Sequence, residues 1–196
     1  MKLLCVIFLA LIISHPVFLQ KENTFPKVKI YQWENVVNAN PDTIFGISFR
    51  KSRISSLPKE LYQFTNLIYL NLEKNKFQEL PENLDTLTKL KYLNISKNKL
   101  KIFPLVVTRL FELEILVANR NHFERLPNNI KYCSKLKSID FWNTPIAFLP
   151  DGFFKLKNLE KLDLSNIRFS PKQHQKIVNT FGGIDLKLDP PCDCMD

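Results

Sequence analysis

Apolar residues recur along this chain with a strict period of 23 residues, without an insertion or a deletion. In each of six successive units, the first, fourth, sixth and eleventh places are all apolar, and Ala118 is the smallest residue among them. The six units begin at Ile44, Leu67, Leu90, Leu113, Leu136 and Leu159. A fixed period of this length is the signature of a solenoid, in which one supersecondary unit stacks on the next. The pattern therefore predicts six stacked repeats over residues 44–169.

Each repeat is predicted to contain a short strand and then a turn that begins at a proline. In the second repeat, Leu67, Leu70 and Leu72 turn inward from such a strand. Proline fixes φ and donates no hydrogen bond, which suits the first turn of a short helix or an irregular segment. Five repeats have an apolar residue and a proline at this place: Leu57-Pro58, Leu80-Pro81, Phe103-Pro104, Leu126-Pro127 and Leu149-Pro150. Because one repeat cannot bury its apolar edge alone, the repeats must stack to form a continuous core.

From residue 44 to about residue 182, this spacing resembles the leucine-rich repeat family, with its pattern LxxLxLxxNxLxxLPxxLxxLxx. The resemblance implies an α/β fold, a right-handed horseshoe solenoid whose parallel sheet forms the concave face. It also implies that the ninth-place residues Asn75, Asn98 and Asn121 bond the backbone of neighbouring turns. Three other residues, Ser52, Thr144 and Ile167, occupy that place in the remaining repeats. We therefore expect this ladder to be complete only in the middle of the stack.

The segment before the repeats is predicted to cover the first open end of the core. Residues 21–43 contain a polar leader and then Trp33, Val36 and Val37 at helical spacing. The pair Asn40-Pro41 ends this helix, because a residue before proline avoids the helical conformation. We expect an N-terminal capping helix here.

Residues 170–196 are predicted to form a C-terminal cap and a tail that contains cysteine. Ser170-Pro171 supplies an N-cap and a first-turn proline, and Gln173 supplies a capping-box partner. The inward face of this capping helix is expected to be Ile177, Val178 and Phe181. Gly182-Gly183 ends the helix, and an extended stretch over residues 184–188 closes the stack. The two caps look similar to those of exported leucine-rich repeat proteins of bacteria, Bacteroidetes-like ones in particular.

Residues 1–20 have the layout of a secretory signal peptide. Lys2 precedes an apolar run over residues 3–13, which is shorter than the roughly 20 apolar residues that span a bilayer. Cleavage after Ser14 and an uncleaved short anchor both remain open. We therefore expect an exported protein that is periplasmic, cell-surface or secreted.

The four cysteines do not form a disulfide framework when they are placed one by one. Cys5 belongs to the signal segment and Cys133 falls on a core position of a repeat. Cys192 and Cys194 stand only two residues apart, so free thiols or intermolecular pairing are favoured over a strained bridge between them. A metal site built from His174 and these two cysteines would have no family spacing, and no metal is predicted.

Residues at the third, fifth and seventh places project from the predicted concave sheet, where they are neighbours across adjacent strands. An apolar and aromatic band results, and its residues are the candidate anchors for a partner: Tyr69, Tyr92, Ile115, Val117 and Trp142. Exposed aromatic residues with polar surroundings are typical of protein interfaces. The alternative is that tyrosines simply suit strands and cover one another.

A second column of residues, at the eighth and tenth places, is basic. Its eighth-place members Lys51, Lys74, Lys97 and Arg120 are further candidate partner contacts, and its tenth-place members are Arg53, Lys76, Lys99 and His122. The formal net charge of the chain is +9. This column is either a solvated edge that keeps the protein soluble or a surface for an anionic partner.

The sequence predicts a binding module and not an enzyme. Cys133 points into the core while His122 lies at the concave edge, and four glycines leave no phosphate-binding loop. We expect no catalytic residue, no cofactor and no small-molecule substrate. The expected partner is a protein that binds the concave face of a monomer, and the basic column favours an acidic one. Export argues against nucleic acid as a partner, despite the positive charge. The alternative is an envelope-associated structural or adhesive protein whose basic edge binds anionic glycan or lipid headgroups.

Overall fold

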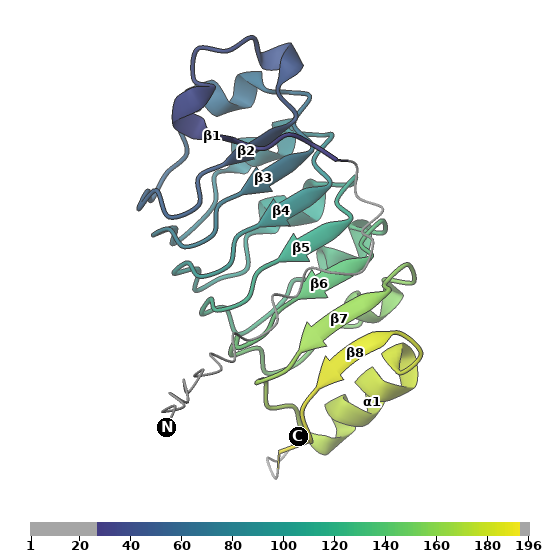
Figure 1. Cartoon of the computed structure of the whole chain (residues 1–196). Helices are drawn as coiled ribbons and strands as arrows, with labels where there is room; N and C mark the ends of the chain where they lie inside the picture. The colour runs from purple at the N-terminus through teal and green to yellow at the C-terminus, as the bar shows by residue number, and fades with distance from the viewer. Residues whose placement is uncertain (1–26, 193–196) are drawn as a thin grey trace, which may run out of the picture.

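The computed structural model describes residues 27–192 and contains one open sheet of eight parallel strands in chain order (Figure 1). The strands are β1 Tyr31–Gln32, β2 Gly46–Ser48, β3 Tyr69–Asn71, β4 Tyr92–Asn94, β5 Ile115–Val117, β6 Ser138–Asp140, β7 Lys161–Leu164 and β8 Asp185–Leu188. From β2 to β7, each strand pairs with the next at a register of 23 residues, as in Tyr69 opposite Tyr92. The predicted α/β solenoid with a parallel sheet is therefore confirmed.

Short 3-10 helices form the back of the stack, behind the sheet in Figure 1. They are η3 Lys59–Gln63, η4 Glu82–Thr86, η5 Leu105–Arg109, η6 Asn128–Tyr132 and η7 Phe153–Lys155. The first four of these begin directly after the predicted prolines, whose extended backbone ends the preceding segment. An α-helix is about 10 Å wide and strands are about 4.8 Å apart, so narrow turns allow the repeats to stack closely.

The core runs through the whole stack between the sheet and these turns. The residues at the first, fourth, sixth and eleventh places are all buried except Ile54, which is half-buried. In the later repeats the rings of Phe103, Phe123 and Phe141 meet edge to face, with centroids 5.3 to 6.2 Å apart. Edge-to-face contacts are a favoured geometry for aromatic rings. These three phenylalanines thus fill the interior of the later repeats.

The expected N-terminal capping helix is replaced by two single 3-10 turns, η1 Trp33–Asn35 and η2 Pro41–Thr43, beside the short strand β1. Three apolar residues over one turn do not repay the cost of nucleating an α-helix. No side chain caps η1, whereas Asn40 caps η2 by accepting a hydrogen bond from the Asp42 N–H. The segment still covers the first repeat, because Trp33 stacks on Phe49 with ring centroids 5.1 Å apart.

The C-terminal end matches the prediction more closely. Helix α1 spans Pro171–Phe181, and the Ser170 hydroxyl accepts a hydrogen bond from the Gln173 N–H. Ile177 and Phe181 are buried, but Val178 is exposed and does not belong to the inward face. Strand β8 pairs with β7 and closes the sheet, and α1 lies at this end of the stack (Figure 1).

Several predictions concern residues outside 27–192. The signal segment over residues 1–20, Cys5 and Cys194 are among them. Cys192 is disulfide-bonded, so the expectation of a free thiol is wrong for this residue. Within residues 27–192, no helix has the length and apolar character needed to cross a membrane.

Candidate binding surface

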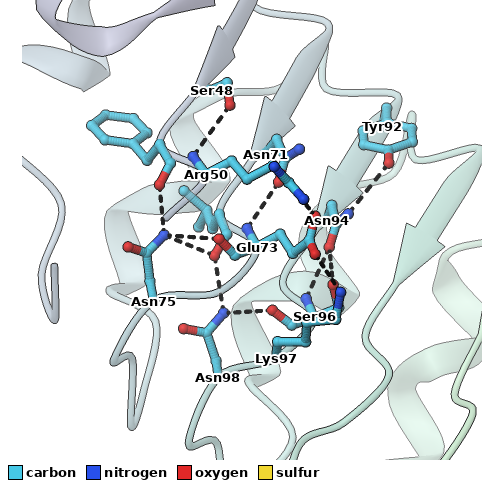
Figure 2. A network of polar contacts seen from close by, with 12 residues as sticks. Ser48, Arg50, Asn71, Glu73, Asn75, Tyr92, Asn94, Ser96, Lys97 and Asn98 are labelled. Carbon is cyan, nitrogen blue, oxygen red and sulfur yellow. Dashed lines mark hydrogen bonds and ion pairs between the residues drawn. The ribbon is translucent and has the colours of Figure 1, made fainter. Parts of the chain in front are cut away.

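The ninth-place asparagines are structural, as the family resemblance implied. Asn98 Nδ2 donates to the carbonyls of Leu72 and Ile95, both at 3.0 Å, and its Oδ1 accepts from the Phe77 N–H at 3.1 Å. Asn75 and Asn121 repeat this arrangement one turn before and one turn after. All three amides are buried, and Figure 2 shows how Asn75 and Asn98 join neighbouring turns. They are therefore not available to a partner.

A second polar ladder, which the sequence analysis did not identify, runs along the fifth place. There a side-chain oxygen accepts a hydrogen bond from the backbone N–H two residues further on, a local turn that Asn, Asp and Ser favour. The acceptors are Ser48, Asn71, Asn94, Asp140 and Asp163, at distances of 2.8 to 3.2 Å. The signal was present in the sequence, because five of six fifth-place residues are Ser, Asn or Asp. Val117 is the exception, since its side chain accepts no hydrogen bond.

Ion pairs link the seventh-place Glu73 to the repeats on both sides (Figure 2). Its two carboxylate oxygens contact Arg50 Nε at 2.8 Å and Lys97 Nζ at 2.6 Å. Burial alone would raise the pKa of Glu73, but the bonds from Lys97 and Arg50 outweigh it and hold that pKa below its ordinary value. Lys97, predicted as a free partner contact, is thus engaged within the protein.

The two tyrosines of the predicted band pack against each other. The rings of Tyr69 and Tyr92 are parallel to within 9°, and their centroids are 4.2 Å apart. Burial raises the pKa of the Tyr92 hydroxyl well above its ordinary value, and the neighbouring Tyr69 adds to this. This geometry fits the alternative in which the tyrosines cover one another. They form one wall of the concave face.

A groove of about 430 Å³ lies on the concave face next to this wall. Tyr92, Ile115 and Val117 line it, and Ile115 and Val117 are both half-buried. The rest of its lining is polar or charged and comes from β4 to β7 and the segments beside them: Glu73, Asn94, Ser96, Lys97, Glu114, Asn119, Lys137, Ser138, Asp140, Glu160 and Lys161. The structure therefore brings three of the five band residues together in one depression, and it places Tyr69 and Trp142 outside the lining.

Polar groups beside Val117 are arranged differently from those of the other repeats. Asn119 Nδ2 donates to Asp140 Oδ2 at 2.6 Å, and Asn119 Oδ1 is buried without a hydrogen-bond partner among the described residues. Burial raises the pKa of the Asp140 carboxyl, and the neighbouring carboxylate of Asp163 adds to this despite the bond from Asn119. The apolar floor of the groove thus lies next to one buried amide oxygen, that of Asn119, which has no hydrogen bond among the described residues.

Trp142 is engaged by the basic column. The Arg120 guanidinium lies over the Trp142 ring at 4.4 Å from its centroid, a cation–π contact. Trp142 is half-buried and therefore offers less free surface than an open anchor would.

The eight residues of the basic column lie in the loops that follow β2 to β5, along one side of the sheet. We call this row the basic edge: Lys51, Arg53, Lys74, Lys76, Lys97, Lys99, Arg120 and His122. All of them are exposed except Lys97. The eighth-place residue of every repeat has a left-handed backbone, with φ between 52° and 64°. This conformation occurs at Lys51, Lys74, Lys97, Arg120, Asn143 and Asn166. The repeat pattern alone does not predict this conformation.

Groups that could perform covalent chemistry are dispersed or buried. Burial raises the pKa of the Cys133 thiol to about 12, so little thiolate exists at neutral pH. The Cys133 thiol lies in the core and donates to the Val107 carbonyl, whereas His122 is exposed at the basic edge. In the described part of the chain, no three His, Cys, Asp or Glu side chains gather in a way that could hold a metal ion.

Comparisons with solved structures identify the fold. No known family model matches the sequence, and no curated protein is similar enough to count as a match. A leucine-rich repeat protein of Leptospira interrogans superposes with a TM-score of 0.70 at 26% identity, over 82% of this chain and 40% of that one. Internalin C2 of Listeria monocytogenes gives a TM-score of 0.59 at 16% identity, over 75% of this chain and 61% of that one.

A third similar structure is the leucine-rich repeat ectodomain of the Arabidopsis thaliana receptor kinase GASSHO1/SCHENGEN3. It gives a TM-score of 0.50 at 24% identity, over 66% of this chain and 16% of that one. This chain thus spans less than two thirds of each of these three proteins. The Bacteroidetes-like origin stays a prediction, but the repeat, the ladders and the comparisons agree on the fold. This chain has the leucine-rich repeat fold.

Proposed function

We propose that this protein is a non-catalytic binding module that captures another protein in its concave groove. The observation that supports this proposal is the break in the polar ladder at β5. On β3 and β4, the fifth-place amides of Asn71 and Asn94 are buried and bonded to the backbone. On β5, Val117 leaves an apolar floor in a groove with a charged rim. A small apolar depression with a polar rim is the usual form of an anchor site at a protein interface.

The proposed anchors are three of the five residues of the predicted band. Tyr92, Ile115 and Val117 line the groove, and the Tyr69 ring stacks on the Tyr92 ring. Among the structures of similar fold is a receptor ectodomain in complex with CASPARIAN STRIP INTEGRITY FACTOR 2, which is compatible with a protein partner. An acidic partner would be steered by Lys74 and Arg120, which are exposed at the rim of the sheet. Export of the protein remains part of this proposal.

Substitutions borrowed from neighbouring repeats test the groove without disturbing the fold. The groove variant is Ile115→Lys with Val117→Asn, because Lys161 occupies the same place on β7 and Asn94 the same place on β4. The control is Ile102→Arg with Leu105→Asn, two exposed apolar residues whose counterparts one repeat later are Arg125 and Asn128. Both variants remove two apolar side chains and add one positive charge.

Capture of proteins from the source cells with the immobilised chain, and quantification by mass spectrometry, compares the two variants. We expect a partner whose recovery falls at least tenfold with the groove variant and changes less than twofold with the control. A partner lost equally with both variants, or lost only with the control, would show that binding does not use the groove. Circular dichroism of both variants confirms that the fold is retained.

A further inference from the structure

The basic edge lies outside the concave groove, apart from Lys97, and its charges are largely uncompensated. Lys97 is paired with Glu73, and Arg120 lies over Trp142. The other five lysines and arginines of the edge make no ion pair with any residue in the described range 27–192: Lys51, Arg53, Lys74, Lys76 and Lys99. A dense row of exposed, unpaired cations is therefore concentrated on one side of the molecule.

The backbone of this row is unfavourable for the residues that occupy it. At the eighth place, φ is 64° at Lys51, 60° at Lys74 and 52° at Arg120. Long side chains avoid this left-handed region, whereas asparagine tolerates it. The fifth and sixth repeats adopt the same turn with Asn143 and Asn166. The fold itself would therefore favour asparagine throughout, and the basic residues of the first four repeats have to be explained by something other than folding.

The row is also regular. Strands β2 to β5 pair in parallel at an unbroken register of 23 residues, so the loops that follow them repeat at the strand spacing of about 4.8 Å. Like charges at this spacing repel one another, and a bound polyanion would remove that repulsion. The regular spacing matches a linear chain with one negative group on each unit better than an acidic protein surface, whose charges are irregular.

We propose that the basic edge of the first four repeats binds a linear acidic polysaccharide that lies along the stack, across the ends of β2 to β5. A chain of uronic acids has the required chemistry, because every sugar ring has one carboxylate. Each carboxylate would meet the eighth-place and tenth-place cations of one repeat. The fifth and sixth repeats, where asparagine holds the eighth place, would end the site.

The test uses three substitutions that the fold already contains. The edge variant is Lys51→Asn, Lys74→Asn and Arg120→Asn, which places at the eighth place the residue found in the last two repeats. The control is Lys59→Gln, Lys155→Gln and Lys157→Gln, three exposed lysines outside the edge. Both variants lose three positive charges. The probes are polygalacturonate, poly-glutamate and phosphatidylcholine vesicles that contain phosphatidylserine.

Binding to polygalacturonate is measured for the full chain at several salt concentrations. We expect the edge variant to bind at least tenfold more weakly and with a shallower salt dependence, because fewer counterions are released. The control should stay within twofold of the unchanged protein. The edge variant should also melt no lower than the unchanged protein, since asparagine suits the left-handed turn.

The outcomes separate this proposal from its rivals. Equal losses in the edge variant and the control would reduce the effect to net charge and overturn the proposal. Tighter binding to poly-glutamate would assign the edge to an acidic protein, and binding to the vesicles alone would assign it to a lipid surface. Absence of binding to all three probes would also overturn it. The groove variant with Lys at position 115 should still bind polygalacturonate, so failure at one site can be distinguished from failure at the other.

Discussion

Strands β4 and β5 are adjacent, equal in length and paired in register, and both line the groove, yet they differ at the fifth place. On β4, the aromatic ring of Tyr92 is stacked and the amide of Asn94 is buried and bonded to the Ser96 N–H. On β5, Ile115 and Val117 are half-buried and line the groove. One change at the fifth place thus replaces a buried amide that is bonded to the backbone with an aliphatic side chain that makes no hydrogen bond. The fifth-place residue therefore determines both whether the following backbone N–H is hydrogen-bonded and whether the surface there is polar or apolar.

The largest loss of stability is expected at the ninth place, where buried asparagines follow both β4 and β5. Asn98→Ala and Asn121→Ala each remove an amide that bonds four backbone groups. Each substitution leaves a buried N–H, that of Phe77 or Leu100, without its acceptor and removes three bonds to carbonyls. An unpaired buried group costs about 1–3 kcal/mol, so each variant should lose about 3 kcal/mol of unfolding free energy. Denaturant unfolding followed by circular dichroism measures this loss.

The two variants should differ in where they loosen. The loop after β4 remains held by Asn94, whereas the loop after β5 has no acceptor at its fifth place. Amide hydrogen exchange should therefore rise over residues 119–121 in Asn121→Ala more than over residues 96–98 in Asn98→Ala. Equal exchange in both loops would mean that the fifth-place bond does not stabilise the turn.

Much of the fold follows from the sequence, because repetition multiplies a weak signal. A single Leu67-x-x-Leu70 pair means little, but six copies with the same register fix the strands, the stack and the Asn98 type of ladder. The C-terminal helix was predictable for a local reason, since Ser170 and Pro171 define its start. The N-terminal segment lacks such a start, and its spacing at Trp33 and Val36 was misleading.

The binding surface was less predictable, because exposure depends on contacts across strands. The sequence identifies Tyr69 and Tyr92 as outward-facing, but not that their rings stack. Nor does it indicate that Glu73 forms an ion pair with Lys97, because that contact depends on the conformations of two long side chains in adjacent repeats. Val117 is conspicuous only after the fifth place is recognised as a column of acceptors.

The polar group on the other side of β5 offers a smaller and pH-dependent test. Asp140 on β6 has the place that Asn94 has on β4, but its carboxyl pKa is raised by burial and by Asp163. An acid whose pKa is raised by folding stabilises the folded state fully below its unfolded pKa and loses that contribution as the pH rises through its folded pKa. Asp140→Asn removes this loss.

The variant Asp140→Asn should therefore be more stable than the unchanged protein at pH 7, by at most about 1 kcal/mol. The difference should shrink below about pH 4, near the ordinary pKa of aspartate, where both side chains are neutral. Thermal unfolding between pH 3 and pH 7 measures it. A variant that is less stable than the unchanged protein at pH 7 would mean that the ionised carboxylate is favourable where it stands.

The smallest effect is expected at Val117 itself. In Val117→Asn, the new amide can accept a hydrogen bond from the Asn119 N–H, as Asn94 does from Ser96. That bond contributes about 1 kcal/mol and offsets the lost burial of a half-buried valine, so stability should change by no more than about 0.5 kcal/mol. Val117→Ala loses burial without gaining an acceptor and should cost about 1 kcal/mol. If denaturant unfolding shows this order, the fold does not require valine at the fifth place of β5. The apolar floor of the groove would then be free to serve binding, whereas a large loss in Val117→Asn would make Val117 a packing residue.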